Sequence, residues 1–259
     1  MAEIRHRETG AILFRTDAPT LRDLDLRGRV LNYSDLRGTQ LSNADASGAN
    51  FEGCHLEGAE FNAGDLSRAN LKGAVLTDSR VMATQLVGAD LTGARLEHGI
   101  YQWSNFGQAR LVEANLRGGD FNRAQFGEAD LTGADARDAR FDFAGLGGAR
   151  LEFATLGGAR FTGADLRDAQ LCQADLALAS FVRTRFAGAD FTRAMFSGTQ
   201  LVGLADLADA VGLDEIEHHR ASFVDLETVR AGAARLPREF LLAAGVREGE
   251  IGALAAAER

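Results

Sequence analysis

Residues 89–93 read ADLTG, and residues 129–133 repeat the same five letters. The leucine of this unit belongs to a series that runs from Leu26 to Leu201 in steps of five, without an insertion or deletion. Of the 36 residues at this position, which we call position i, 21 are Leu and 11 are Phe. So long a repeat sets the architecture of the chain before any local secondary structure is considered.

A period of five residues matches neither the 3.6-residue turn of a helix nor the two-residue alternation of a strand. From Ser34 to Thr199 every residue at position i−2 is Ala, Ser, Thr, Gly or Cys, and it shares a face with position i. Position i+2 is Gly in 16 of the 36 units, and glycine tolerates the positive φ of a sharp corner. The pattern therefore predicts an all-β solenoid with position i inside and position i+2 at each corner.

The units at 89–93, 129–133 and 164–166 follow the pattern A(D/N)LXX, and over residues 24–203 the chain resembles the pentapeptide repeat family. The resemblance implies a right-handed quadrilateral β-helix with four pentapeptides per turn, hence about nine turns and a rod roughly 43 Å long. Residues 20 apart should then stack. The stacked residues at position i on one face include an interior aromatic row of Phe121, Phe141, Phe161 and Phe181.

Both ends of the chain depart from this period. Residues 1–23 contain two apolar stretches on either side of Gly10, which predicts an N-terminal hairpin cap. Residues 204–259 have helical spacing, and we expect a small α-helical C-terminal segment that caps the rod or dimerises it. The expected helices lie over 204–211, after Asp225, after Pro237 and over 248–257.

The composition disfavours several classes of protein. The chain has 259 residues and a net charge of −9, which argues against direct binding to nucleic acid. It has no run of about 18 apolar residues and no apolar signal segment near its start, so we expect a cytoplasmic protein that does not enter a membrane. The two cysteines, Cys54 and Cys172, do not make a disulfide framework.

No motif indicates catalysis, and we predict a protein that is not an enzyme and holds no metal and no cofactor. His55 and His98 fall at outward positions of the repeat, and His218 and His219 are adjacent rather than four apart, so all four are expected at the surface. Aspartate recurs at position i−1, where we expect it to be solvated or hydrogen-bonded rather than paired for acid–base chemistry.

One face of the predicted rod concentrates arginine and large apolar residues on its outer surface. At one corner, Trp103, Arg123 and Phe143 should stack as ring, guanidinium and ring, which suits cation–π contact. Such a stack can be a local surface feature that adds stability, or it can be a binding patch for a protein. The candidate protein-binding patch comprises Arg80, Met82, Ile100, Trp103, Arg123, Arg140, Phe143 and Arg160.

Charge separates the functions that the resemblance implies. One branch of the family, which confers quinolone resistance, acts on DNA gyrase or topoisomerase IV with an acidic rod that resembles B-form DNA. Here residues 24–203 hold 22 acidic and 18 basic residues, whereas residues 204–259 hold 11 acidic and 6 basic residues. The rod is therefore nearly balanced, and the leading hypothesis is a non-enzymatic interaction scaffold with a protein partner, the gyrase-directed DNA mimic being the first alternative.

A second alternative rests on the tail. Residues 223–246 resemble a segment that follows the repeats in some bacterial pentapeptide proteins, and in some of those an effector domain comes next. This resemblance implies a sensor or adaptor subunit of a bacterial defence or signalling system. It leaves open whether the tail caps the rod, forms a homodimer or connects to an effector.

Overall fold

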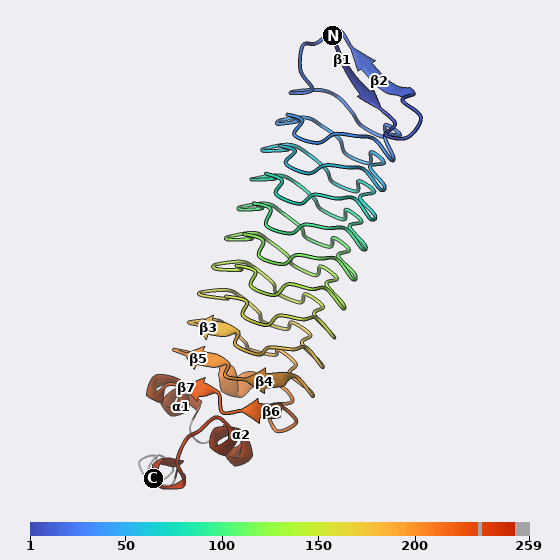
Figure 1. Cartoon of the computed structure of the whole chain (residues 1–259). Coiled ribbons are helices and arrows are strands. Elements are labelled where there is room, and N and C mark those ends of the chain that lie inside the picture. The colour runs from blue at the N-terminus through green and yellow to red at the C-terminus, as the bar shows by residue number, and fades with distance from the viewer. Residues whose placement is uncertain (233–234, 252–259) are drawn as a thin grey trace.

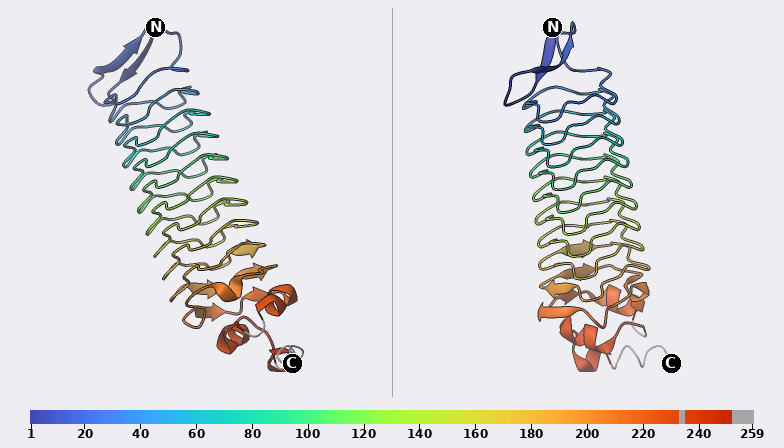
Figure 2. Two further views of the ribbon diagram at one scale, coloured as in Figure 1. Left: turned by 180° about the vertical axis from the view of Figure 1, so that it is seen from behind. Right: turned by 90° about the vertical axis from the view of Figure 1, so that its right-hand side faces the viewer.

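The computed structural model describes residues 1–232 and 235–251, and in it the backbone coils into a rod with a hairpin at one end and helices at the other (Figure 1). Two further views show that the coils keep the same outline along the rod (Figure 2). The elements in chain order are β1 (Ala2–Arg5), β2 (Ile12–Thr16), β3 (Ser180–Val182), β4 (Met195–Ser197), β5 (Gln200–Val202), η1 (Leu207–Asp209), β6 (Glu217–Arg220), β7 (Phe223–Val224), α1 (Leu226–Gly232) and α2 (Arg238–Ala243).

The coils are joined by parallel pairing between residues that are 20 apart. Asp25 pairs with Asp45, Asp45 with Asp65, and the same spacing continues to Asp175 and Met195. Each pairing involves one residue at position i−1, flanked by backbone bonds such as Leu26 N–H to the carbonyl of Asp45 at 2.7 Å. Most paired stretches are single residues because a corner interrupts the chain after every unit, so few of them qualify as strands.

Every corner has a positive φ at position i+2, and most corners also close with a backbone hydrogen bond. At the residues 41–44, the N–H of Ala44 donates to the carbonyl of Leu41 at 3.1 Å, and φ at Asn43 is +61°. A four-residue turn with positive φ at its third residue has the signature of a type II turn. All 36 residues at position i+2 have φ between +52° and +75°, including the 20 that are not glycine. The fold therefore imposes this conformation on whatever side chain occupies the corner.

The interior is filled by position i, as the sequence predicts. We call Tyr101, Phe121, Phe141, Phe161 and Phe181 the inner ladder, and each of these side chains is at most 1% exposed. Successive rings are stacked with centroids 4.9–5.2 Å apart. Beyond Phe181 the rod is plugged by edge-to-face contacts that link, in turn, Phe181, Phe186, Phe191 and Phe196.

At the N-terminal end, β1 and β2 form the antiparallel hairpin expected there, with φ of +69° at Gly10. The hairpin is attached to the first coil. Arg7 N–H donates to the carbonyl of Tyr33 at 2.9 Å, and His6 pairs with Ser34. Ile4 is fully buried against the interior, so the hairpin covers apolar side chains of the first coil.

The C-terminal end differs from the expected all-helical segment, because parallel pairing extends beyond residue 203. Val211 pairs with Asp190, β6 pairs with β4, and β7 pairs with β5. The partners lie 21, 22 and then 23 residues apart, as Asp190–Val211, Met195–Glu217 and Gln200–Phe223 show. Extra residues at each step remove the five-residue period, so the sequence pattern gave no sign of these two strands.

Two of the expected helices are present. Asp225 accepts a hydrogen bond from the N–H of Thr228 at 3.0 Å, which caps α1, and α2 begins directly after Pro237. The helix expected over 204–211 is reduced to η1, since β-pairing takes up Val211. Of the helix expected over 248–257, residues 252–257 lie outside the described part of the chain, while 248–251 are helical.

His218 is only partly exposed, and its ring faces other rings, although the sequence predicted a surface position for it. It pairs in register with Phe196, and its ring lies 5.9 Å from the ring of Phe196 and 5.8 Å from that of Phe240. Both ring nitrogens are buried without a hydrogen-bond partner, and this burial lowers the pKa of His218 from its ordinary value. A neutral His218 therefore extends the interior stack of rings into the C-terminal segment.

Candidate functional site

Trp103, Arg123 and Phe143, which we call the outer ladder, occupy the same corner of three successive coils. The guanidinium carbon of Arg123 lies 4.5 Å from the ring centroid of Trp103 and 5.5 Å from that of Phe143. Trp103 is 55% exposed and Phe143 is 54% exposed. The structure thus brings together the ring–guanidinium–ring stack that the sequence predicted and leaves two large aromatic side chains open to solvent.

The backbone holds the outer ladder in register. The three corner N–H groups donate to carbonyls of the next coil at 3.1, 2.9 and 2.8 Å, so each corner is tied to the one below. Gly163 follows Phe143 in the same column. A Cβ atom at Gly163 would lie 2.8 Å from atoms of the Phe143 ring. The ring can occupy this position only because residue 163 has no side chain. The ladder is therefore pre-organised before any partner arrives.

The remaining residues of the predicted patch share one face beside this corner. Arg80 pairs with Ile100 in the adjacent coil, and Arg140 pairs with Arg160. Met82 and Ile100 are half-buried, whereas the three arginines are exposed. The structure therefore places all eight patch residues on one continuous side of the rod.

A buried carboxylate, which the sequence reasoning did not select, lies between two of these arginines. The Asp142 side chain is 5% exposed, and its Oδ2 lies 3.7 Å from Arg140 Nε and 3.5 Å from Arg160 Nη2. Its Oδ1 accepts the N–H of Thr162 at 3.1 Å. Asp142 lies at position i+1, where the repeat pattern predicts an outward side chain, so no sequence signal marked it as buried. The charges of Arg140 and Arg160 are thus partly neutralised, in contrast to Arg123.

A second exposed phenylalanine provides a comparison within the same molecule. Phe153 is 58% exposed and occupies position i+2, as Phe143 does, but at a different corner of the rod. No cation–π contact involves Phe153 among the described residues. Its neighbours in the same column, 20 residues before and after, are Gly133 and Gln173. Exposure of an aromatic corner residue therefore does not by itself produce a stack.

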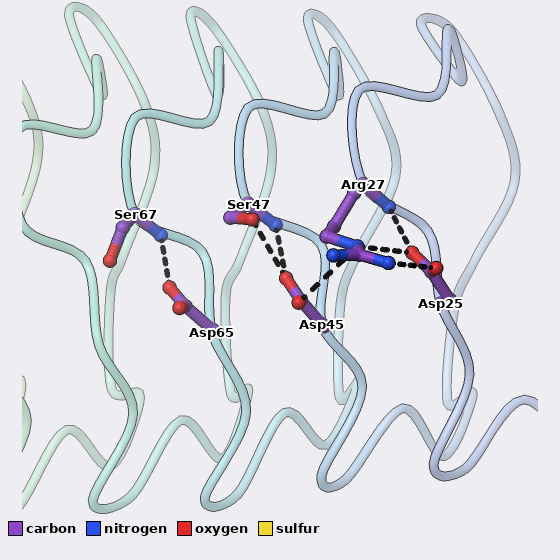
Figure 3. Close-up of polar contacts among 6 residues, drawn as sticks. All are labelled: Asp25, Arg27, Asp45, Ser47, Asp65 and Ser67. Atoms are coloured by element: carbon purple, nitrogen blue, oxygen red, sulfur yellow. Dashed lines mark hydrogen bonds and ion pairs between the residues drawn. The ribbon is translucent and has the colours of Figure 1, made fainter.

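The recurring aspartates at position i−1 have a structural role. Asp25, Asp45 and Asp65 lie in successive coils, and each accepts a hydrogen bond from the N–H two residues later, at 3.1, 3.1 and 2.8 Å (Figure 3). This is the Asx-turn geometry that favours Asp and Asn. The hydrogen bond from Arg27 holds the pKa of Asp25 well below its ordinary value. These carboxylates are hydrogen-bonded, as predicted, and are not paired for acid–base work.

Other potential sites carry no comparable geometry. Cys54 is buried and burial raises the pKa of its thiol, while burial and the nearby Asp190 raise the pKa of Cys172 to about 11. Within residues 1–232 and 235–251, no group of three or more His, Cys, Asp or Glu side chains is placed to hold a metal ion. In the same part of the chain, none of the helices has the length and apolar character needed to cross a bilayer.

The geometry defines a solenoid repeat protein with a preformed surface stack, and the sequence comparison identifies its family. The family model of pentapeptide repeats matches in 8 copies over residues 21–58, 55–97, 109–144, 144–181 and 173–203, which is more than half of the chain. The chain belongs to the pentapeptide repeat family, and its fold is accordingly a right-handed quadrilateral β-helix. The match points to a family of structural or interaction proteins and to no catalytic family.

Several solved structures are similar to this chain. One is HetL of Nostoc sp. strain PCC 7120, a pentapeptide repeat protein involved in heterocyst differentiation regulation. It is 26% identical to this chain, with a TM-score of 0.43, and the match covers 78% of this chain and 90% of the HetL chain. A pentapeptide repeat protein of the Arabidopsis thaliana thylakoid lumen is 34% identical over 40% of this chain and 69% of its own, with a TM-score of 0.36.

A trypsin-treated variant of QnrB1, a plasmid-mediated fluoroquinolone resistance protein, is 18% identical with a TM-score of 0.38, covering 83% of this chain and 96% of its own. Among curated protein sequences, none is similar enough to this chain to count as a match.

Proposed function

We propose that this protein is a non-enzymatic interaction scaffold, in which the rod holds the outer ladder and its neighbouring face in place for a protein partner. The observation that carries the proposal is the clamped Arg123, which lies between Trp103 and Phe143 while both rings are more than half exposed. Exposed Trp, Arg and Phe that are fixed in position are typical of residues that dominate protein interfaces.

The rigidity of the rod supports a binding role. Ordering a loose side chain on binding costs about 0.5–1.5 kcal/mol, and the outer ladder avoids much of this cost because its members already restrain one another. The backbone bonds from each corner to the next coil add to this restraint. A flat and repetitive surface of this kind suits an extended contact that spans several coils.

Partner capture tests the proposal. The full chain and the double variant Trp103→Ala/Arg123→Ala are used as bait in extracts of the source organism. We expect the double variant to lose at least one partner that the full chain retains. The matched control is Phe153→Ala/Arg193→Ala, which removes an aromatic residue and an arginine from another corner and should retain that partner. Equal capture by the two double variants would contradict a binding role for the outer ladder.

A gyrase-directed DNA mimic is the second candidate, and the column of Asp25, Asp45 and Asp65 favours it locally (Figure 3). The overall charge does not. Duplex DNA carries one negative charge per about 1.7 Å, or roughly 25 over the length proposed for the rod, against a net charge of −4 for residues 24–203. Supercoiling by purified gyrase, with and without the protein, tests this candidate; inhibition at micromolar protein would support it.

The ends of the rod complete the proposal. We propose that the nine-turn rod of residues 24–203 is capped by the hairpin of residues 1–23 and by the segment 204–259, because solenoids need both terminal coils covered. That segment could also form a homodimer or connect the rod to an effector, as in a sensor or adaptor. Light scattering of the full chain and of a chain ending at residue 203 tests dimerisation. We place the protein in the cytoplasm.

A further inference from the structure

Arg123 has a free set of hydrogen-bond donors while it lies between two aromatic rings. Its guanidinium donates no hydrogen bond and forms no ion pair with any of the described residues, although its two faces are covered by Trp103 and Phe143. The five N–H donors of a guanidinium lie in its plane. Stacking therefore uses the faces of the group and leaves its donor edge open to an acceptor from outside.

The corner column that contains Arg123 has no acidic residue from position 43 to position 203. The column at 20-residue spacing reads Asn43, Ala63, Ala83, Trp103, Arg123, Phe143, Gly163, Arg183 and Gly203. The face beside it holds five basic and three acidic residues, counted over the nine units centred at residues 41, 61 and so on to 201. A basic strip on a chain of net charge −9 favours an acidic partner at this place.

We propose that the outer ladder receives a carboxylate side chain from an acidic segment of a partner protein, with apolar side chains of that segment packing on Trp103 and Phe143. This inference rests on the proposed function and adds the chemistry of the partner. A carboxylate binds a guanidinium edge through two parallel hydrogen bonds, which the fixed plane of Arg123 is ready to donate. The aromatic rings on both sides exclude water from that pair.

The number of free cations favours a carboxylate over a nucleic acid. Binding to a phosphate backbone draws on several arginines or lysines at once. Here Arg140 and Arg160 share Asp142. The other arginines on this side, Arg80 and Arg183, lie two and three coils away from Arg123, or roughly 10 and 14 Å. One guanidinium at one position matches a single carboxylate group.

The test uses a random dodecapeptide library displayed on phage. Clones are selected on the full chain and depleted on Arg123→Gln. Because Trp103 is the only tryptophan, its fluorescence reports binding at the outer ladder directly. A synthetic peptide from the strongest clone is titrated against the full chain, against Arg123→Gln and against the control Arg193→Gln, which removes an exposed arginine from another corner.

We expect the selected clones to carry Asp or Glu next to apolar residues and the synthetic peptide to change Trp103 fluorescence. Arg123→Gln, or replacement of the peptide carboxylates by amides, should weaken binding about tenfold or more, while Arg193→Gln should leave it unchanged. Clones that bind at Trp103 without carboxylates would overturn the inference but leave the binding role of the outer ladder standing.

Other results would also overturn the inference. A twelve-nucleotide oligodeoxythymidine that binds at Trp103 more tightly than any peptide would assign the site to nucleic acid. Self-association that depends on protein concentration and disappears in Arg123→Gln would assign it to a second copy of the chain. If no clone distinguishes the full chain from Arg123→Gln and partner capture is also insensitive to the outer ladder, both the inference and the proposed function fail.

Discussion

The inner ladder and the outer ladder are two stacks built by the same coils, and their members are only two residues apart in sequence. Phe141 is fully buried, whereas Phe143 is 54% exposed. Ring centroids in the inner ladder are 4.9–5.2 Å apart, and the outer ladder places an arginine between its two rings at 4.5 and 5.5 Å. One repeat thus produces an apolar stack that stabilises the rod and an exposed one that is available for recognition.

The largest expected effect of a substitution lies in the inner ladder. Phe141→Ala should lower the free energy of unfolding by about 3–5 kcal/mol, because it leaves a cavity between two stacked rings. Phe143→Ala should change it by less than about 1 kcal/mol, since an exposed ring contributes mainly one cation–π contact. Denaturant unfolding of both variants measures the difference. Equal losses would show that the two ladders do not have separate roles.

A second prediction concerns the C-terminal end of the interior stack. The pKa of His218 is lowered in the folded chain because burial disfavours its charged form. Because the folded pKa lies below the unfolded value of 6.5, the stability that neutral His218 gives the fold is fully present above pH 6.5. It is lost as the pH falls from 6.5 through the folded pKa. Between pH 7.5 and 5, the segment that contains β6 and α2 should therefore lose protection in hydrogen exchange before the inner ladder does.

The control for this pH effect is His218→Phe, which keeps a ring between Phe196 and Phe240 and removes the titrating group. Protection of the same segment should then no longer depend on pH in that range. If the pH dependence persists in His218→Phe, another group is responsible for it.

The third prediction separates backbone strain from the outer ladder. Gly93 and Gly163 have φ of +64° and +65°, but a Cβ at Gly93 meets nothing within 4 Å, whereas one at Gly163 meets the ring of Phe143 at 2.8 Å. Gly93→Ala should cost about 1 kcal/mol through the backbone alone. Gly163→Ala should cost roughly 0.5–1 kcal/mol more and should shift the emission of Trp103, because Phe143 must leave its position. Identical values for the two variants would show that Phe143 contributes nothing to the stack.

The smallest expected effect is a stabilisation at a corner. Ala83 has φ of +52° and is exposed, so Ala83→Gly relieves a left-handed conformation at a site without packing. After the entropy cost of glycine is subtracted, we expect a gain of about 0.5–1 kcal/mol in thermal or denaturant unfolding. Ala89→Gly, at the buried position i−2, should be destabilising instead. A loss of stability in Ala83→Gly would contradict the view that the corners carry strain.

Much of the rod was predictable from the sequence because every coil repeats one environment. Position i alone predicted the interior, including the row of Phe121, Phe141, Phe161 and Phe181, and the 20-residue spacing predicted the outer ladder. The repeat pattern does not predict a side-chain position that occurs in one coil only. Asp142 occupies an outward position yet is buried, with the guanidinium groups of Arg140 and Arg160 near one carboxylate oxygen and the N–H of Thr162 on the other.

The C-terminal segment was harder to predict for a related reason. The last coil exposes unpaired backbone groups, and the chain satisfies them with β6 and β7, which lie 22 and 23 residues after their partners. Because the spacing between partners changes at each step, this part of the sequence has no fixed period from which the strands could be predicted. The sequence therefore predicts a surface position for His218, although its register with Phe196 places the two rings in contact.

The central claim is that the partner binds at the outer ladder and not at another exposed aromatic corner. The most direct test places the photo-crosslinking amino acid benzoylphenylalanine at position 143 or at position 153 of the protein in the source organism. The two positions are comparable because Phe143 is 54% exposed and Phe153 is 58% exposed. We predict a crosslinked protein from position 143 that is absent from position 153 and is lost when Arg123→Gln is added. The same crosslink from both positions, or from position 153 alone, would contradict the claim.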